Sequence, residues 1–173
     1  LILAQARNIP QANSALKSGR WERNEWTGVE LADKTLGIIG LGRIGKLVAQ
    51  RALAFGMNLV AYDPFVAAER ARQLSVQLMS LKELIQISDF LTIHVAKTPE
   101  TENLINAELL SHAKPCLRII NVARGGIVNE ADLAEAVTAG KIAGAAIDVF
   151  ENEPVTESPL FSLPQIVVTP HLG

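Results

Sequence analysis

Residues 35–45 read TLGIIGLGRIG, and this stretch decides the fold of the chain. Its first five residues form a short apolar run typical of a buried strand, and a helical pattern of apolar residues follows the glycines. Gly40 allows a tight turn, Gly42 lets the backbone approach a pyrophosphate, and Gly45 lets helix and strand pack closely. The free N–H groups at such a helix start face an anion. The stretch therefore predicts a strand, turn and helix that bind a dinucleotide.

A second apolar run extends from Met57 to Tyr62 and ends at Asp63. In dinucleotide-binding units, an acidic residue about 20 positions beyond the glycines holds the ribose 2′-hydroxyl. The negative charge of Asp63 would repel a 2′-phosphate, so the sequence predicts NAD rather than NADP. A glycine-rich turn alone is a weak signal, but the strand, the helix and Asp63 together make it specific.

Strand-like and helical stretches alternate along the chain, which favours a Rossmann-type doubly wound parallel sheet with right-handed crossovers. A capping box at Ser80 opens a helix over Leu81–Ile87, Thr98-Pro99 places a proline at a first helical position, and Gly140 ends a helix over Glu130–Ala139. The predicted strands are Leu36–Ile39, Asn58–Tyr62, Val76–Gln77, Phe90–Val95, Arg118–Val122, Gly144–Val149 and Ile166–Val168.

Three polar side chains follow apolar runs in the second half: Arg124 in NVARGG, Glu153 in ENEP and His171 in TPHLG. Parallel strands deliver loops of this kind to one ligand cleft. A guanidinium holds a carboxylate through two parallel hydrogen bonds, while a carboxylate beside an imidazole fixes its tautomer and stabilises its protonated form. Taken singly, such residues are more often a surface charge, a loop end and a satisfied polar group. Beside a dinucleotide site, the three residues together indicate a site that holds an anion and moves a proton.

From Gly28 to Gly173 the chain resembles the NAD-binding domain of the D-isomer-specific 2-hydroxyacid dehydrogenases. The motifs GLGRIG, AYDP, NVARGGIVNE, GAAIDVFENEP and VVTPHLG occur in the family's order and spacing. The resemblance implies NAD-dependent oxidation of a small 2-hydroxy acid. It also implies that Arg124 binds the substrate carboxylate and carbonyl oxygen, that His171 is the acid and base, and that Glu153 pairs with His171.

The same resemblance assigns the cofactor contacts. It places Arg43 and Ile44 at the pyrophosphate, Asp63 on the adenosine ribose, the backbone from Val122 to Arg124 along the nicotinamide, and Asp148 near the carboxamide. The full set of expected cofactor-binding residues is Gly40, Gly42, Arg43, Ile44, Gly45, Asp63, Val95, Val122, Ala123, Arg124, Asp148, His171 and Gly173.

Two positions depart from the family pattern. Family members carry Thr or Leu and then Pro after the histidine that follows the fourth strand, whereas this chain has Val95 and Ala96, so Val95 offers no hydroxyl to the cofactor. Cys116 stands where a glycine is common, and we expect its side chain to cost a little stability but no chemistry. His94 lies at a strand end, and a packed or solvated imidazole is favoured there over an adenine contact.

The resemblance also implies a longer protein. Residues 1–27 are expected to form a crossover helix and a subunit-interface loop, and residues 28–173 the NAD-binding domain, with the substrate domain outside this chain. Trp21 and Trp26 flank Arg23, and large aromatic residues suit an interface, so a dimer or tetramer is expected. A local cluster within the same domain is the alternative for the two tryptophans.

The composition limits the classes of function that the chain can have. The 173 residues are 49% hydrophobic, enough for a sizeable core. The net charge of −2 shows no excess of basic residues of the kind that binds nucleic acid. The single cysteine excludes a disulfide framework, no residue cluster has metal-ligand spacing, and no apolar run approaches the roughly 20 residues of a membrane span. The cytoplasm is the expected location.

Two other functions stay open on the sequence. A hydroxypyruvate or glyoxylate reductase would use the same three polar residues, and only the absent substrate domain would tell them apart. Corepressors that sense NAD share this domain and act as binding modules, although nothing in the sequence indicates a peptide-docking role.

Overall fold

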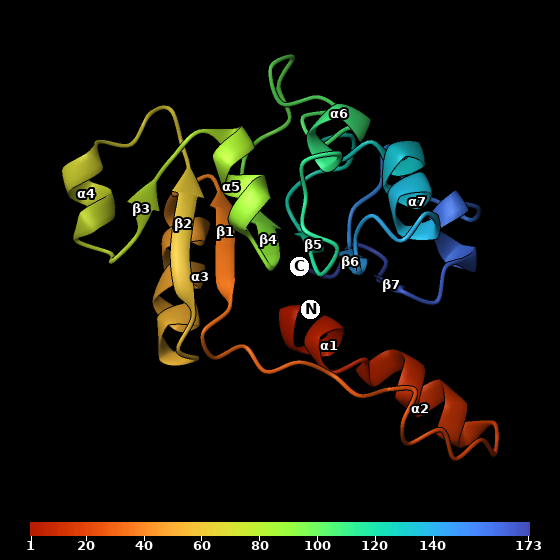
Figure 1. Ribbon diagram of the computed structural model, residues 1–173. Coiled ribbons are helices and arrows are strands. Elements are labelled where there is room, and N and C mark those ends of the chain that lie inside the picture. Colours follow the sequence, from red (N-terminus) through yellow and green to blue (C-terminus); the bar gives the residue numbers. More distant parts are fainter.

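The computed structural model describes all 173 residues, which form one seven-stranded sheet in the order β3-β2-β1-β4-β5-β6-β7 (Figure 1). Every pair of neighbouring strands is parallel, which confirms the predicted doubly wound sheet. The strands are β1 (Thr35–Ile39), β2 (Asn58–Tyr62), β3 (Gln77–Leu78), β4 (Phe90–Ile93), β5 (Arg118–Asn121), β6 (Gly144–Ile147) and β7 (Ile166–Val168).

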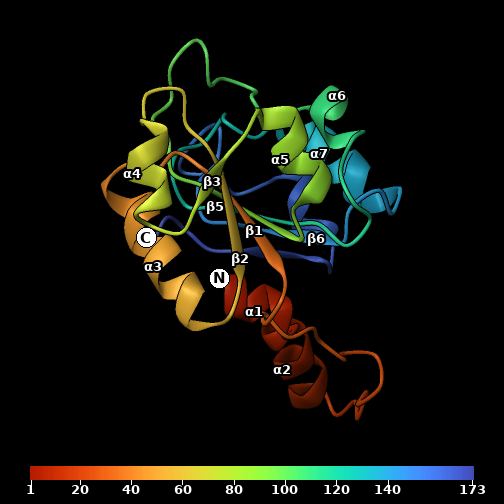
Figure 2. The same ribbon diagram turned by 60° about the vertical axis from the view of Figure 1, so that its left-hand side comes forward.

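Helices cover both faces of the sheet, with α3 on one side and α5, α6 and α7 on the other (Figure 2). Strand residues alternate between these faces, so each strand supplies both layers of core. In β1, Leu36 and Ile38 pack with α3, whereas Ile39 packs with α5 and α7. The helices are α1 (Ile2–Ala6), α2 (Ile9–Lys17), α3 (Arg43–Ala54), α4 (Ala68–Arg72), α5 (Leu81–Ile87), α6 (Ala107–Leu110), α7 (Glu130–Thr138) and the 3₁₀ helix η1 (Pro159–Ser162).

The central strands end in register at one edge of the sheet. Ile93 of β4 pairs with Asn121 of β5, Asn121 with Ile147 of β6, and Ile147 with Val168 of β7. The predicted strands β4, β5 and β6 were therefore one or two residues too long, because each loop departs where the neighbouring ladder ends. This common edge is where a doubly wound sheet binds its ligand.

Two further boundaries differ from the sequence prediction. Strand β3 begins at Gln77 rather than Val76, because the N–H of Val76 bonds to Ala71 O and not to β2. The proline at Thr98-Pro99 opens only a turn, so a helix there was wrong. The hydroxyl of Thr101 accepts the N–H of Thr98 and stabilises this turn. Asn103 then adopts a left-handed conformation with φ of 50°, so the chain does not continue as a helix.

Cys116 is exposed and is not among the residues with positive φ. The backbone there therefore needs no glycine, which removes the reason for the expected cost in stability.

The N-terminal segment contacts the rest of the domain through both of its helices, since Gln11 of α2 donates to Pro164 O at 2.8 Å. Gln5 of α1 donates to Gln165 O at 2.8 Å, and the N–H of Val29 returns to Ala6 O. Helix α2 projects away from the sheet in both views (Figures 1 and 2). Trp26 Nε1 donates to Glu22, whereas Trp21 is 81% exposed. The subunit interface stays a prediction.

No helix is long and apolar enough to cross a membrane. The structure also holds no group of three or more His, Cys, Asp or Glu side chains arranged to bind a metal ion.

Candidate dinucleotide and catalytic site

The glycine turn between β1 and α3 has the shape that the sequence predicts. Gly40 has φ of +92°, and a Cβ there would stand 2.7 Å from His94 O. A Cβ on Gly45 would stand 2.0 Å from Gly40 O, so helix and strand touch at this point. A Cβ on Gly42 would meet nothing within 4 Å. The backbone at Gly42 is thus open to an approaching pyrophosphate, and Arg43 and Ile44 are exposed beside it.

Asp63 follows β2 and is tied to the glycine turn. Its Oδ2 accepts the N–H of Leu41 at 2.8 Å, and its Oδ1 accepts the N–H of Phe65 at 2.9 Å. The carboxylate lines a cavity of about 730 Å³ together with Gly40, Gly42 and Val95. Since a carboxylate oxygen accepts more than one hydrogen bond, Asp63 can hold a ribose hydroxyl as well. Val95 lies in this cavity with an apolar side chain.

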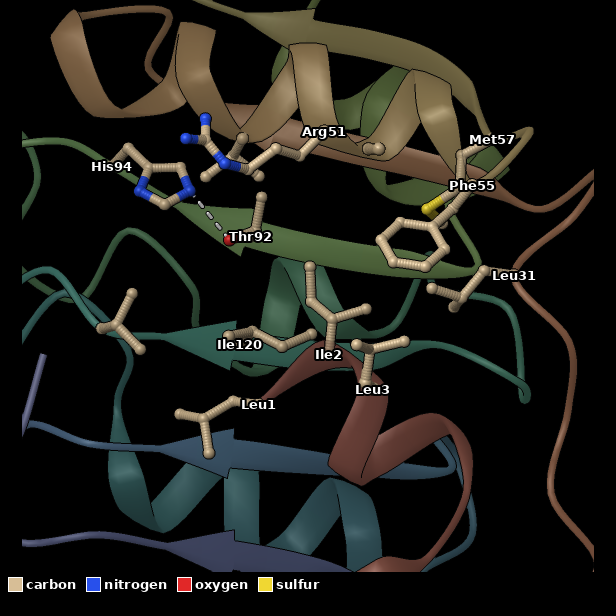
Figure 3. A pocket seen from close by; sticks show the side chains of 13 residues that line it. Leu1, Ile2, Leu3, Leu31, Arg51, Phe55, Met57, Thr92, His94 and Ile120 are labelled. Atoms are coloured by element: carbon tan, nitrogen blue, oxygen red, sulfur yellow. Dashed lines mark hydrogen bonds between the residues drawn. The ribbon is translucent and has the colours of Figure 1, made fainter.

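His94 separates this cavity from a smaller apolar one of about 290 Å³ (Figure 3). Its Nε2 lies 2.9 Å from the hydroxyl of Thr92, and burial lowers its pKa to about 4. The imidazole is therefore neutral at neutral pH. His94 is a packed histidine, as the sequence favours, and it also lines the cavity beside Asp63.

Glu153 and His171 form a hydrogen-bonded pair that joins two loops. Nδ1 of His171 lies 2.6 Å from Oε2 of Glu153, and Oε1 of Glu153 accepts the N–H of Phe150 at 2.9 Å. These two bonds, the one from His171 first, lower the pKa of Glu153. Because Nδ1 faces the carboxylate, Nε2 is the nitrogen left to act on a substrate. The structure thus brings together two of the three side chains singled out from the sequence.

Asp148 anchors the segment that carries His171. Its side chain accepts the hydroxyl of Thr169, the N–H of Leu172 at 2.9 Å and the N–H of Gly173 at 2.8 Å, and its backbone oxygen accepts the N–H of His171. Burial alone would raise the pKa of Asp148, yet these hydrogen bonds together lower it. Asp148 is only 2% exposed, so a buried carboxylate holds the segment that carries the imidazole of His171.

Arg124 lies on the loop after β5, and buried Asn121 shapes that loop. Asn121 Nδ2 donates to Arg124 O at 3.0 Å and its Oδ1 accepts the N–H of Ala123 at 3.1 Å. The next residue, Gly125, packs against Phe150 O so closely that a Cβ would stand 1.7 Å away. The guanidinium is exposed and donates to Ala123 O; no hydrogen bond or ion pair joins it to Glu153 or His171.

Sequence reasoning missed the supporting roles of Asn121, Asp148 and Thr169. Asp148 was expected only beside the cofactor, and here it also fixes the C-terminal loop. A buried polar residue at a strand end, as in the NVARGG and IDVF stretches, is the signal that could have indicated a loop anchor. Gly173 lies against Asp148 and Val122, so the loops after β5 and β7 meet at the expected cofactor edge.

The chain matches, over residues 1–173, the family described as "D-isomer specific 2-hydroxyacid dehydrogenase, NAD binding domain". The D-3-phosphoglycerate dehydrogenase of Mycobacterium tuberculosis (strain ATCC 25618 / H37Rv) is 53% identical over 173 residues, covering 100% of this chain and 33% of that protein. The chain therefore spans about a third of the length of such relatives.

Solved structures show the same fold. A glyoxylate reductase from Paecilomyes thermophila superposes with a TM-score of 0.91 at 32% identity, covering 99% of this chain and 52% of that one. An acyclic imino acid reductase in complex with NADPH and D-Arg superposes with a TM-score of 0.88 at 29% identity, covering 99% and 54%. The chain belongs to the D-isomer-specific 2-hydroxyacid dehydrogenases, as their NAD-binding domain.

The residues present fit NAD, the dinucleotide of this domain family. The open backbone at Gly42 leaves room for the pyrophosphate, and the cavity that continues to Asp63 has the size and the carboxylate that an adenosine ribose requires.

Proposed function

We propose that the protein containing this chain oxidises D-3-phosphoglycerate to 3-phosphohydroxypyruvate with NAD⁺. The single observation that carries the chemistry is the His171–Glu153 pair, which lies at the edge of the sheet that also holds the glycine turn. The identity of about half with proteins named D-3-phosphoglycerate dehydrogenase supports the substrate.

His171 is the base of the proposed reaction. Its Nε2 takes the proton of the substrate hydroxyl, while Nδ1 stays bonded to Glu153. The negative charge of Glu153 stabilises the imidazolium that forms, and the Phe150 N–H keeps this carboxylate in place. Bound NAD⁺ supplies the hydride acceptor. In the opposite direction the protonated imidazole returns the proton to the carbonyl oxygen.

Arg124 is the proposed anion-binding group. Its guanidinium is exposed and bonds only to the neighbouring Ala123 O, so it is free to turn toward a bound carboxylate. A guanidinium holds a carboxylate through two parallel hydrogen bonds and polarises the adjacent carbonyl. The hydrogen bond from Asn121 and the close contact at Gly125 fix the backbone of the loop that carries Arg124.

The proposed cofactor contacts are those of the sequence prediction. The glycine turn with Arg43 and Ile44 holds the pyrophosphate, Asp63 holds the adenosine ribose, and Val95 lines the adenosine cavity. Backbone from Val122 to Arg124, with Asp148, His171 and Gly173, lines the nicotinamide end. Asp63 makes NAD the preferred dinucleotide.

Self-association is the second part of the proposal. Helix α2 projects from the sheet, and Trp21, Ile9 and Leu16 on or beside it are exposed. A partner subunit would bury these side chains, so the intact protein is expected to be a dimer or tetramer. Sedimentation of a monomer at micromolar concentration would contradict this part.

Another 2-hydroxy acid is the alternative substrate, favoured by the fold shared with a glyoxylate reductase at 32% identity. Steady-state assays of the full-length protein with 3-phosphoglycerate, glycerate and 2-hydroxyglutarate would decide. We expect the highest kcat/KM with 3-phosphoglycerate. A higher value for glycerate would move the assignment to a hydroxypyruvate or glyoxylate reductase, and no turnover with any 2-hydroxy acid would favour an NAD-sensing binding module.

A further inference from the structure

The cavity beside the glycine turn has two rims, and each carries a carboxylate. One rim consists of Tyr62 at the end of β2 with Asp63–Phe65; the other consists of His94–Ala96, Thr98, Glu100 and Thr101 after β4. We call these the Asp63 rim and the Glu100 rim. Both line the same cavity of about 730 Å³, into which Gly40 and Gly42 also open. A nucleotide whose ribose reaches Asp63 therefore lies in a cavity that Glu100 also borders.

The turn that holds Glu100 is fixed by hydrogen bonds. The hydroxyl of Thr101 accepts the N–H of Thr98 at 2.8 Å and donates to Ala96 O at 2.7 Å, and the N–H of Thr101 bonds to Thr98 O. The Thr98 hydroxyl and the N–H of Glu100 itself lower the pKa of the Glu100 carboxyl. Glu100 is thus ionised at neutral pH and held at the cavity.

Nothing in the cavity wall compensates these two negative charges. None of its 14 lining residues is Lys or Arg. His94 lines it as a neutral imidazole, because burial lowers its pKa to about 4. Lys97 lies on the same loop but does not line the cavity, and its ammonium stands 3.5 Å from Glu102. A phosphate entering this cavity would face two carboxylates and no cation.

We propose that Glu100 acts with Asp63 as a second carboxylate that makes the cavity favour NAD over NADP. The inference rests on the proposed placement of the adenosine ribose at Asp63. A 2′-phosphate carries between one and two negative charges near neutral pH, and an unpaired like charge is a means of rejecting a competing ligand. The backbone fold itself is no barrier, since a protein with the same fold is in complex with NADPH.

The test measures the adenosine end alone, in the full-length protein, by calorimetry. Adenosine 5′-monophosphate and adenosine 2′,5′-bisphosphate serve as probes that differ by the 2′-phosphate. Glu100→Gln is compared with Glu108→Gln, the same change at an exposed side chain outside the cavity. We expect Glu100→Gln to improve binding of the bisphosphate relative to the monophosphate about two- to fivefold, the range for removing one exposed like charge. Glu108→Gln should leave this ratio unchanged.

A charge reversal keeps the test decisive if Glu100→Gln loses stability. Glu100→Lys should shift the ratio roughly tenfold or more at low salt, and 0.5 M salt should reduce that gain because it screens the added charge. Equal ratios in the Glu100 and Glu108 variants, with thermal unfolding unchanged, would overturn the proposal. Nucleotides are the only ligands here, so a failure to turn over 3-phosphoglycerate would leave this result standing.

Discussion

The two halves of the site are built in different ways. At β1 and β2 the proposed dinucleotide site is built from backbone: Gly42 leaves open space, whereas Gly40 and Gly45 allow close contacts that a side chain would obstruct. At β5, β6 and β7 the proposed substrate site is built from side chains on three loops, held by hydrogen bonds to Asn121 and Asp148. We infer that the affinity for the dinucleotide depends mainly on backbone shape, whereas proton transfer depends on where charges are placed. Changes to the glycines should therefore act on NAD affinity, and changes to the catalytic side chains should act on turnover.

Asp148 gives the largest expected effect on stability, because its buried charge accepts several hydrogen bonds in the second half. Asp148→Asn removes the charge that accepts three donors and should cost roughly 1.5–3 kcal/mol of unfolding free energy at pH 7. Urea unfolding measures this, and Asp33→Asn, at an exposed aspartate, is the matched control.

The pH dependence of this effect has a defined sign. Hydrogen bonding lowers the pKa of Asp148, so its contribution to stability is present above the unfolded-state pKa of about 3.9 and is lost as pH falls through the lower folded value. The difference between wild type and Asp148→Asn should shrink below about pH 4. A difference that stays constant from pH 7 to pH 3 would show that charge plays no part in this anchor.

In the first half, two glycines should respond differently to the same change. Gly45→Ala places a methyl group 2.0 Å from Gly40 O and should cost roughly 1–3 kcal/mol of stability as well as NAD affinity. Gly42→Ala meets no atom within 4 Å, so stability should stay within about 0.5 kcal/mol while NAD binding weakens. Thermal unfolding and calorimetry separate the two effects. Equal destabilisation by both substitutions would contradict the shape argument.

Arg124→Lys tests geometry against charge in the second half. Lysine keeps the positive charge but loses the planar fork that grips a carboxylate, so kcat/KM should fall about tenfold, mainly through KM. NAD affinity should stay within about twofold, because the guanidinium bonds only to its own loop. An unchanged KM would remove Arg124 from substrate binding.

Glu153→Gln should give the smallest effect, seen in kcat. Glu153 is ionised through the neutral range because its bond to His171, and then that from Phe150, lower its pKa. Glutamine can still bond to Nδ1 of His171 but brings no negative charge to the imidazolium that forms in the reaction, so kcat should fall about three- to fivefold while the Kd for NAD⁺ stays within about twofold. An unchanged kcat would remove Glu153 from the mechanism.

The sequence predicted the first half better than the second, for a physical reason. The glycine turn is encoded in eleven consecutive residues, and each glycine's role follows from local sterics. The anchoring of His171 joins Asp148 to residues 24 and 25 positions later, which no local pattern reveals. Strand ends were misjudged at Val95, Val122 and Val149 because the neighbouring ladder decides where a strand stops. The helix predicted at Thr98-Pro99 does not form, because the hydroxyl of Thr101 accepts the N–H of Thr98 and stabilises a turn instead.

The central claim is that His171 moves the substrate proton and contributes little to the affinity for the dinucleotide, although it borders the nicotinamide end. Its most direct test is His171→Asn in the full-length protein, with kcat from steady-state assays and NAD affinity from calorimetry on the same preparation. The account predicts a fall in kcat of roughly 10²–10⁴-fold or more, with the Kd for NAD⁺ within about twofold of wild type. Wild-type turnover in His171→Asn would contradict the whole assignment.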